Sequence, residues 1–228
     1  MQRDKAMSAA ACVVLSCLFA MTHVVSGRAA ETGNDRSGPV LELLFEGSLT
    51  DSSPSNRAGT AQGPVAFVDG RQGKCVSLDG RSWVDTAFPQ KELGEQFTVE
   101  CWVNPDKQQS PHADVFGNHV SENLGFVLQQ DGTNTNQFLA AYGAGAGKWV
   151  LTDAVPLTAG RWQHVALVKT REDLRLYLNG VQVSSVEDAA PARPSPMPVA
   201  VGLGYTAQER CFRGQIDEFR IWSKALTD

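Results

Sequence analysis

The chain has 228 residues, of which 42% are hydrophobic and 20% are charged, and its formal net charge at pH 7 is -5. This length is sufficient for one domain with a full hydrophobic core. The acidic balance and the lack of a run of basic residues beyond the N-terminus argue against nucleic acid and anionic membranes as partners, because both require clustered Lys and Arg.

The N-terminus has the pattern of an export signal. Basic Arg3 and Lys5 precede an apolar run over residues 6–21, and small residues follow at 25–30. The run of about 15 residues is shorter than the roughly 20 needed for a membrane-spanning helix. An uncleaved anchor and lipidation of Cys17 are the alternatives. We expect a signal peptide over 1–27, no membrane insertion after its cleavage, and a secreted, periplasmic or cell-surface protein.

A polar leader is expected over residues 28–38, because this segment has almost nothing to bury. A single domain is expected over residues 39–228. Within it, short runs rich in Val, Leu, Phe and Trp alternate with clusters of Gly, Pro, Asn and Asp, which indicates β-strands and turns. Strands are expected at 40–45, 74–78, 83–86, 97–104, 125–130, 138–142, 148–152, 162–169, 174–178, 181–183, 199–201 and 214–222.

The best strands alternate between two faces. In 97–104, Phe97, Val99, Cys101 and Val103 share one face. The strand at 162–169 carries apolar residues on both faces, and the same is true of 97–104, so both are expected in the centre of a sheet. About a dozen such strands predict an all-β fold with two packed antiparallel sheets.

Turn chemistry and loops complete the pattern. Asn179-Gly180 supplies the two positive-φ residues of a type I′ hairpin turn. Two long connections are expected, over 105–114 and over the proline-rich 187–198. Long loops in a compact domain are common places for recognition.

Several spaced segments together resemble a known family. They are LLFEG at 43–47, GKCVSLDG ending at Gly80, FTVECWVNPD, GRWQHVALVKTREDLRLYLNGVQV, and FRGQIDEFRIWSKAL near the end. This order is similar to that of the laminin G-like domains of the concanavalin A-like lectin and glucanase superfamily. The resemblance implies a jelly-roll β-sandwich whose first and last strands are neighbours. It does not imply one particular ligand.

Catalytic residues are not evident. Glycoside hydrolases need two carboxylates on one face, whereas Asp217 and Glu218 are consecutive on a strand and so face opposite ways. The histidines lack Cys, Asp or Glu at metal-ligand spacing, and His164 is expected to be structural. We therefore expect a protein that is not an enzyme.

A structural calcium ion is the one cofactor that the sequence suggests. Calcium prefers several oxygen ligands, and the resemblance places the first strand beside the last. Glu46 and Asp217 would then meet, with Asp51 and Asn56 from the next loop completing the shell. The alternative is that these carboxylates accept hydrogen bonds from loop amides without metal.

Ligand contacts are expected from aromatic and amide side chains near turns. Tyr142 and Trp149 flank the glycine-rich turn at 143–147, Tyr205 lies near another turn, and Asn118 is a polar loop residue. His119, Asn134 and Asn136 are further polar candidates. The other four tryptophans lie in apolar strand patterns and are expected in the core: Trp83, Trp102, Trp162 and Trp222.

Three cysteines remain after signal cleavage, namely Cys75, Cys101 and Cys211. Export to an oxidising compartment allows one pair. Because Cys101 lies on an apolar strand face, a bridge between Cys75 and Cys211 is favoured.

Together these patterns favour a carbohydrate-binding or adhesion-type module whose partner is a glycan or an extracellular protein. A protein-interaction or structural domain without a sugar site is the first alternative. A glycan-active hydrolase is the second.

Overall fold

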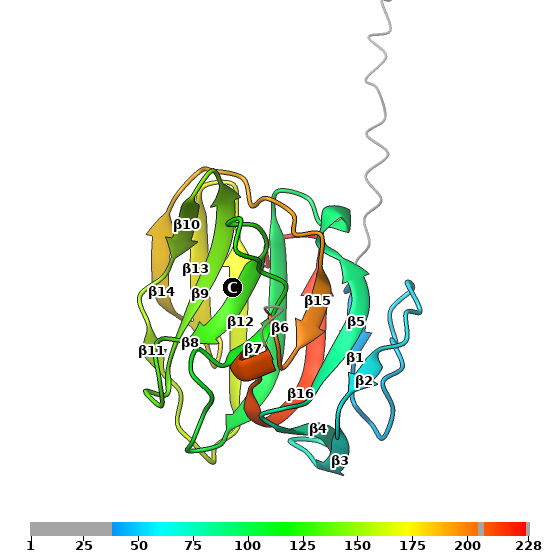
Figure 1. Cartoon of the computed structure of the whole chain (residues 1–228). Helices are drawn as coiled ribbons and strands as arrows, with labels where there is room; N and C mark the ends of the chain where they lie inside the picture. Colours follow the sequence, from blue (N-terminus) through cyan, green and yellow to red (C-terminus); the bar gives the residue numbers. More distant parts are fainter. Residues whose placement is uncertain (1–37, 205–207, 227–228) are drawn as a thin grey trace, which may run out of the picture. The chain divides into compact units, whose positions relative to one another are not determined.

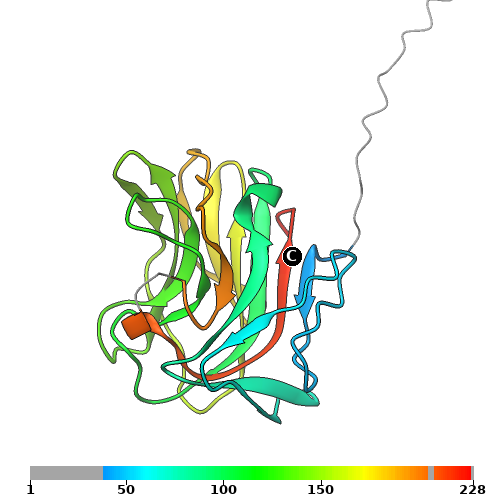
Figure 2. The same cartoon turned by 45° about the vertical axis from the view of Figure 1, so that its right-hand side comes forward.

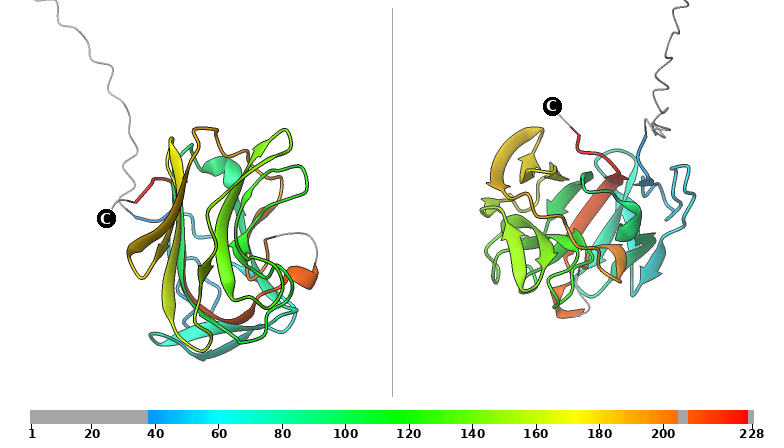
Figure 3. Two further views of the ribbon diagram at one scale, coloured as in Figure 1. Left: turned by 90° about the vertical axis from the view of Figure 1, so that its left-hand side faces the viewer. Right: turned by 90° about the horizontal axis from the view of Figure 1, so that it is seen from above.

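A computed structural model describes residues 38–204 and 208–226, and Figure 1 shows their arrangement. Within these residues, all regular structure is β-strand except for two 3-10 turns, η1 (Gln90–Glu92) and η2 (Gln208–Arg210). The strands form two eight-stranded antiparallel sheets. Seen from the side, the sheets lie face to face as two layers (Figure 3).

The first sheet has the spatial order β14-β13-β12-β6-β16-β4-β3, and β1 pairs with β16 beside this path. Its two central strands, β6 and β12, are those whose two apolar faces predicted a central position. The members of the first sheet are β1 (Leu41–Leu43), β3 (Ala66–Asp69), β4 (Lys74–Asp79), β6 (Phe97–Pro105), β12 (Gln163–Lys169), β13 (Asp173–Leu178), β14 (Val181–Glu187) and β16 (Arg213–Trp222).

The second sheet has the order β10-β9-β8-β7-β15-β5-β2, and β11 pairs with β9. It is built mainly from the middle of the chain. Its members are β2 (Thr60–Gln62), β5 (Trp83–Pro89), β7 (Asp114–Gly117), β8 (Phe126–Gln130), β9 (Gln137–Gly145), β10 (Lys148–Leu151), β11 (Val155–Pro156) and β15 (Pro198–Val201).

The first and last strands are neighbours, as the family resemblance implied. Leu41 of β1 lies opposite Ile221 of β16, and the two strands run side by side in Figure 2. A pairing between residues so far apart in the chain closes the domain. It also places the loops after β1 close to β16.

The core lies between the sheets and is formed by the alternating inward residues. The ring centroids of Phe97 on β6 and Phe126 on β8 are 5.1 Å apart. Those of Phe116 on β7 and Phe219 on β16 are 5.7 Å apart. These aromatic pairs join the two layers, and each such pair contributes about 0.5–1.5 kcal/mol beyond its burial.

The hairpin prediction is confirmed, because Asn179 and Gly180 have φ values of 53° and 79°. The prediction that four tryptophans lie in the core is wrong. All four are half-buried and lie outside the buried hydrophobic cluster: Trp83, Trp102, Trp162 and Trp222. An indole combines a broad apolar ring with a polar N–H group, so it suits partly exposed positions.

Candidate functional site

A pocket of about 360 Å³ lies on the outer face of the second sheet, over β8, β9 and β10. Strand alternation creates its floor. Phe126 and Leu128 point into the core, and Val127 between them points outward, where it joins Ala141 and Leu151. We call this site the Arg210 pocket. Its lining consists of His112, His119, Val120, Ser121, Val127, Gln129, Ala141, Trp149, Leu151 and Arg210.

Trp149 forms one side of the Arg210 pocket. It begins the regular part of β10, directly after a bulge between Lys148 and Trp149. Trp149 is half-buried and packs against the small apolar cluster of Val127, Leu139 and Ala141. The ring of His119 meets it edge-on, with centroids 5.8 Å apart and planes at 81°. The indole is therefore held in place while part of it stays accessible.

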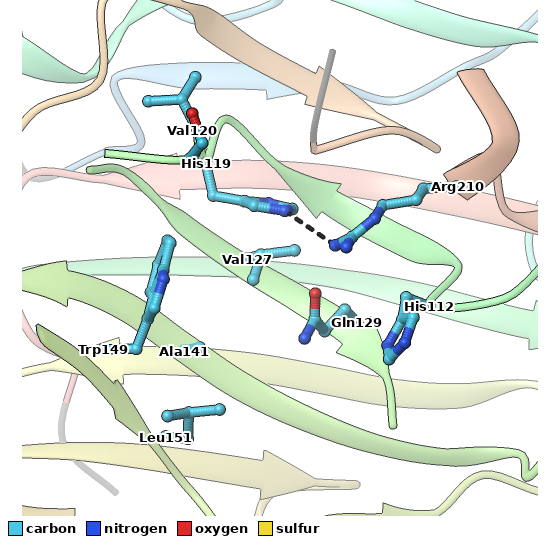
Figure 4. A pocket seen from close by; sticks show the side chains of 10 residues that line it. His112, His119, Val120, Val127, Gln129, Ala141, Trp149, Leu151 and Arg210 are labelled. Atoms are coloured by element: carbon cyan, nitrogen blue, oxygen red, sulfur yellow. Dashed lines mark hydrogen bonds between the residues drawn. The ribbon is translucent and has the colours of Figure 1, made fainter. Parts of the chain in front are cut away.

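His119 and Arg210 come from distant parts of the chain and meet in this pocket (Figure 4). His119 lies in the loop between β7 and β8, whereas Arg210 ends η2. The Nη1 atom of Arg210 is 3.3 Å from Nε2 of His119. Burial, aided by the nearby Arg210 charge, lowers the pKa of His119 to about 3. The imidazole is thus neutral at physiological pH, and its Nε2 accepts a hydrogen bond from the guanidinium.

Asp114 lies next to this pair without lining the pocket. It pairs with Gln129 across β7 and β8 and is completely buried. Its Oδ2 accepts a hydrogen bond from the amide of Gly204 at 3.2 Å. Its Oδ1 has no hydrogen-bond partner among the described residues. Burial raises the pKa of Asp114 well above its usual range, against the opposing effect of Arg210.

The predicted ligand residues are not brought together. Trp149 lines the pocket, but Tyr142 is fully buried, and its hydroxyl donates to the backbone of Ala190 at 2.9 Å. Asn118 is also buried and donates to Gln90 and Met197, which makes it structural. The predictions of Tyr142 and Asn118 as surface contacts are therefore wrong. Tyr205 lies outside the described residues.

The pocket contains one residue that no pattern in the sequence singled out. Arg210 stands in QERCF with no motif around it, 91 residues from its partner His119. His119 was a candidate only as a polar loop residue. Its role as a buried neighbour of Arg210 depends on tertiary structure.

Asp51 does not have the environment of a metal ligand. Its Oδ1 accepts hydrogen bonds from the amides of Glu42 and Ser53, and its Oδ2 accepts from Arg57 N and from the hydroxyls of Ser53 and Ser55. A carboxylate has about four lone-pair positions, so little capacity remains for a cation. Although burial acts to raise the pKa of Asp51, the hydrogen bonds lower it.

Glu46 and Asp217 meet the same turn between β3 and β4. Glu46 accepts the amide of Lys74 at 2.9 Å, and Asp217 accepts those of Arg71 and Gln72. The described residues hold no group of three or more His, Cys, Asp or Glu side chains placed for a metal ion. Asp51, Glu46 and Asp217 thus all accept loop amides, as the alternative without metal expects, and calcium binding stays a prediction.

The expected bridge between Cys75 and Cys211 is absent, because both thiols are free and buried, as is Cys101. The register explains the separation. Val76 lies opposite Ile216, so Cys75 lies near Asp217 on β16. Arg213–Asp217 alone spans about 13 Å at ~3.3 Å per residue, and Cys211 lies beyond it. Disulfides require Cα atoms within about 7 Å.

A second hollow lies on the outer face of the first sheet and includes Glu100 and His164. His164 Nε2 is 3.2 Å from Glu100 Oε2, which supports the expected structural role of the histidine. Burial acts to raise the pKa of Glu100, but hydrogen bonds from His164 and Trp222 lower it. The carboxylate thus serves as a shared acceptor within the sheet.

None of the described segments contains a helix that is long and apolar enough to cross a membrane.

The fold and its exposed pocket define a class, the jelly-roll β-sandwiches with an open face. Comparison with known proteins identifies the family. A laminin G family model, described as the concanavalin A-like lectin/glucanases superfamily, matches residues 78–228. The chain belongs to this family.

Relatives of known sequence or structure are distant. Pappalysin-1 of Mus musculus is 26% identical over 148 residues, which is 58% of this chain and 9% of that protein. Among solved structures, domain 4 of AbnA, a GH43 extracellular arabinanase from Geobacillus stearothermophilus, in complex with arabinotriose, aligns with TM-score 0.66 and 23% identity, covering 83% of this chain and 94% of that one.

Two toxin domains align with similar quality. The binding domain of Paraclostridial Mosquitocidal Protein 1 aligns with TM-score 0.67 and 20% identity, and the alignment covers 84% of this chain and 50% of the toxin chain. The binding domain of Botulinum Neurotoxin DC in complex with SialylT aligns with TM-score 0.64 and 15% identity, and the alignment covers 84% of this chain and 49% of the neurotoxin chain. This chain thus spans about half of each toxin domain. At these identities the likeness shows the fold.

Proposed function

We propose that this protein is a secreted carbohydrate-binding module and that the Arg210 pocket is its sugar site. The observation that carries the proposal is the accessible indole of Trp149 beside the polar groups of His119, Gln129 and Arg210. Aromatic rings pack against the C–H faces of sugars, while a few fixed polar groups bind the hydroxyls. Both kinds of contact are present in this pocket.

Two structural relatives support this proposal. The arabinanase domain was solved with arabinotriose, and the neurotoxin binding domain was solved with SialylT. Both share the fold of this chain. Their ligands differ, so they support a sugar-binding role without indicating which sugar is bound.

We further propose that the module is not catalytic. The lining of the Arg210 pocket contains neither Asp nor Glu among the described residues. Glycoside hydrolysis ordinarily requires two carboxylates about 5–9 Å apart on either side of the bond. Asp114, which pairs with the lining residue Gln129, is buried on β7 and does not line the pocket.

A glycan array with the secreted full-length product tests the sugar proposal. Trp149→Ala should abolish the signal of every glycan that the wild type binds, because it removes the ring that forms the pocket wall. Trp162→Ala is the matched control, since Trp162 is also half-buried but does not line the pocket. An array without any bound glycan, or equal binding by both variants, would contradict the proposal.

Protein interaction is a second candidate, favoured by the free edge of the first sheet. Among the described strands, β14 pairs only with β13, and its Val181 and Val183 are 64% and 40% exposed. An exposed edge strand with apolar side chains can pair with a strand of another protein. Val183→Lys would block such pairing and leave sugar binding unchanged, so the two candidates are separable by a pull-down alongside the array.

Export and calcium remain predictions. N-terminal sequencing of exported protein should begin at Arg28 if the signal peptide ends at Gly27. For calcium, the two carboxylates to test are Glu46 and Asp217, which accept amides of the same turn between β3 and β4. A higher melting temperature in excess calcium than in chelator, lost in Glu46→Gln, would support the ion. Identical melting temperatures would exclude it.

A further inference from the structure

One side of the Arg210 pocket is apolar and the other is polar, and this arrangement points to a particular class of sugar. We propose that the pocket takes an N-acetylated sugar, whose acetamido group lies between Leu151 and Gln129. This inference rests on the proposed sugar-binding function. It goes beyond that function because an accessible indole alone would suit any hexose.

The apolar side follows from the register of three neighbouring strands. Val127 of β8 lies opposite Ala141 of β9, and Ala141 lies opposite Leu151 of β10. The three outward side chains therefore form one row across the sheet, and Trp149 lies two residues before Leu151 on the same face of β10. Leu151 is 44% exposed, whereas Val127 and Ala141 are almost completely buried. The accessible apolar surface of this row is thus concentrated at Leu151, beside the indole.

Gln129 forms the polar side of the pocket. It lies two residues after Val127 on β8 and so faces outward, and Figure 4 shows it across the pocket from Trp149 and Leu151. Its side-chain amide makes no hydrogen bond to a described residue, and neither of its polar atoms is among the buried ones that lack a partner. The amide is therefore open to a ligand, to which it offers two N–H donors and a carbonyl acceptor.

The spacing between the two sides suits an acetamido group. Gln129 and Leu151 are separated by two strand spacings and by one step of two residues, which places their Cα atoms about 12 Å apart. Both side chains cover part of this distance and leave room for a few atoms. An acetamido group has a methyl group at one end and a carbonyl and an N–H group beside it. Its methyl group can contact Leu151 while its carbonyl or N–H group forms a hydrogen bond with Gln129.

Other substituents at the same position of the sugar fit less well. A hydroxyl group is shorter, so it cannot contact Leu151 and reach Gln129 at once, and against the leucine it would lose water without gaining a partner. A free amino group is cationic and finds no Asp or Glu in the described lining. The methyl group of a deoxy sugar leaves the amide of Gln129 without a partner. The acetamido group is the substituent that meets both sides.

Calorimetric titration of the secreted full-length product with matched probes tests this inference. Triacetylchitotriose is compared with cellotriose, and methyl N-acetylgalactosaminide with methyl galactoside, because the members of each pair differ only in an acetamido or a hydroxyl group at carbon 2. In at least one pair the acetylated probe should bind about 10-fold more tightly or better, as expected for one hydrogen bond and one apolar contact. Deacetylated chitotriose should bind no more tightly than cellotriose.

Two substitutions remove the two contacts separately. Gln129→Met keeps the length of the side chain without its amide, and Leu151→Ser removes the apolar contact. Each should reduce the preference for the acetylated probe by about 5-fold or more. Gln72→Met and Met197→Ser are the matched controls, because both residues are exposed and neither lines the pocket. Melting curves check that each variant is folded. If Gln129→Met does not fold, Leu151→Ser decides, since its side chain is 44% exposed.

The outcomes separate this inference from the function on which it rests. Equal affinity for acetylated and hydroxyl probes, together with loss of binding in Trp149→Ala, would overturn the N-acetylated ligand and keep the sugar site. Array binding confined to glycans without an acetamido group would do the same. No glycan bound on the array and no probe bound in solution would overturn both. A preference for the acetylated probe that persists undiminished in folded Gln129→Met and Leu151→Ser would place the acetamido group elsewhere and also overturn the inference.

Discussion

His119 gives the structure its clearest pH dependence. Its ordinary pKa of 6.5 falls to about 3 in the folded protein, mainly because the ring is buried and secondly because of Arg210. Between these values the unfolded chain binds a proton that the native protein does not bind. Stability must therefore rise with pH in this window and fall as the solution is acidified from pH 6.5 toward 3.

The size of this loss in the free energy of unfolding follows from the two pKa values of His119. At pH 7.5 the histidine is neutral in both states and contributes almost nothing. At pH 5.0 the unfolded state gains about 2 kcal/mol, since each pKa unit corresponds to ~1.4 kcal/mol and pH 5.0 lies 1.5 units below the ordinary value. For a domain of this size, a loss of about 2 kcal/mol lowers the melting temperature by roughly 4–8 °C.

Urea unfolding of wild type and His119→Gln at both pH values measures this effect. The glutamine keeps an acceptor for Arg210 but has no titrating group, so the variant should lose about 2 kcal/mol less than the wild type between pH 7.5 and 5.0. Asp114 and the other acids are common to both proteins and cancel in the difference. His112→Gln is the control that keeps His119. Equal losses in wild type and His119→Gln would refute the assignment of a buried, neutral imidazole.

Three further predictions test the framework of the fold. Gly143→Ala should destabilise the fold by about 1–3 kcal/mol, because the added Cβ would clash with the carbonyl oxygen of Asn123. Gly94→Ala should leave the urea midpoint unchanged, because a Cβ at Gly94 would have nothing within 4 Å. Asp51→Asn should cost about 1.5–3 kcal/mol through lost charge-assisted hydrogen bonds, and exposed Asp153→Asn should cost almost nothing. Alkylation with peptide mapping should label Cys75, Cys101 and Cys211 only after denaturation, since all three thiols are buried and free. Labelling of any of them in the native protein, or a disulfide between two of them, would contradict the structure.

Alternation and turn chemistry predicted most of the fold. The strand with Phe97 and Val99 was identified because residues of one face recur with a period of two in a strand. The hairpin turn was identified from Asn179-Gly180, because few other residues tolerate positive φ. The strands that escaped prediction are short or exposed. Residues 66–69, for example, are mostly exposed and bury no continuous face, so they carry no hydrophobic signal.

The errors at the site have physical causes as well. Tyr142 was assigned to the surface because it precedes a glycine-rich turn. Its alternation with Phe138 and Ala140 placed it on the inner face of β9, and the structure follows the alternation. Arg210 was not predictable, because its partner His119 is reached only when η2 packs over the second sheet.

Two buried acidic residues of this protein have the same structural role. Asp51 and Asp217 are buried where loops meet strands, and each accepts several backbone amides. These carboxylates hold the turns beside β1 and β16 in the first sheet, whereas the Arg210 pocket lies on the second sheet. The negative charges of Asp51 and Asp217 therefore lie in the framework of the first sheet and not in the pocket. As far as the structure describes it, the pocket lining contains no Asp or Glu, although the chain has a formal net charge of -5.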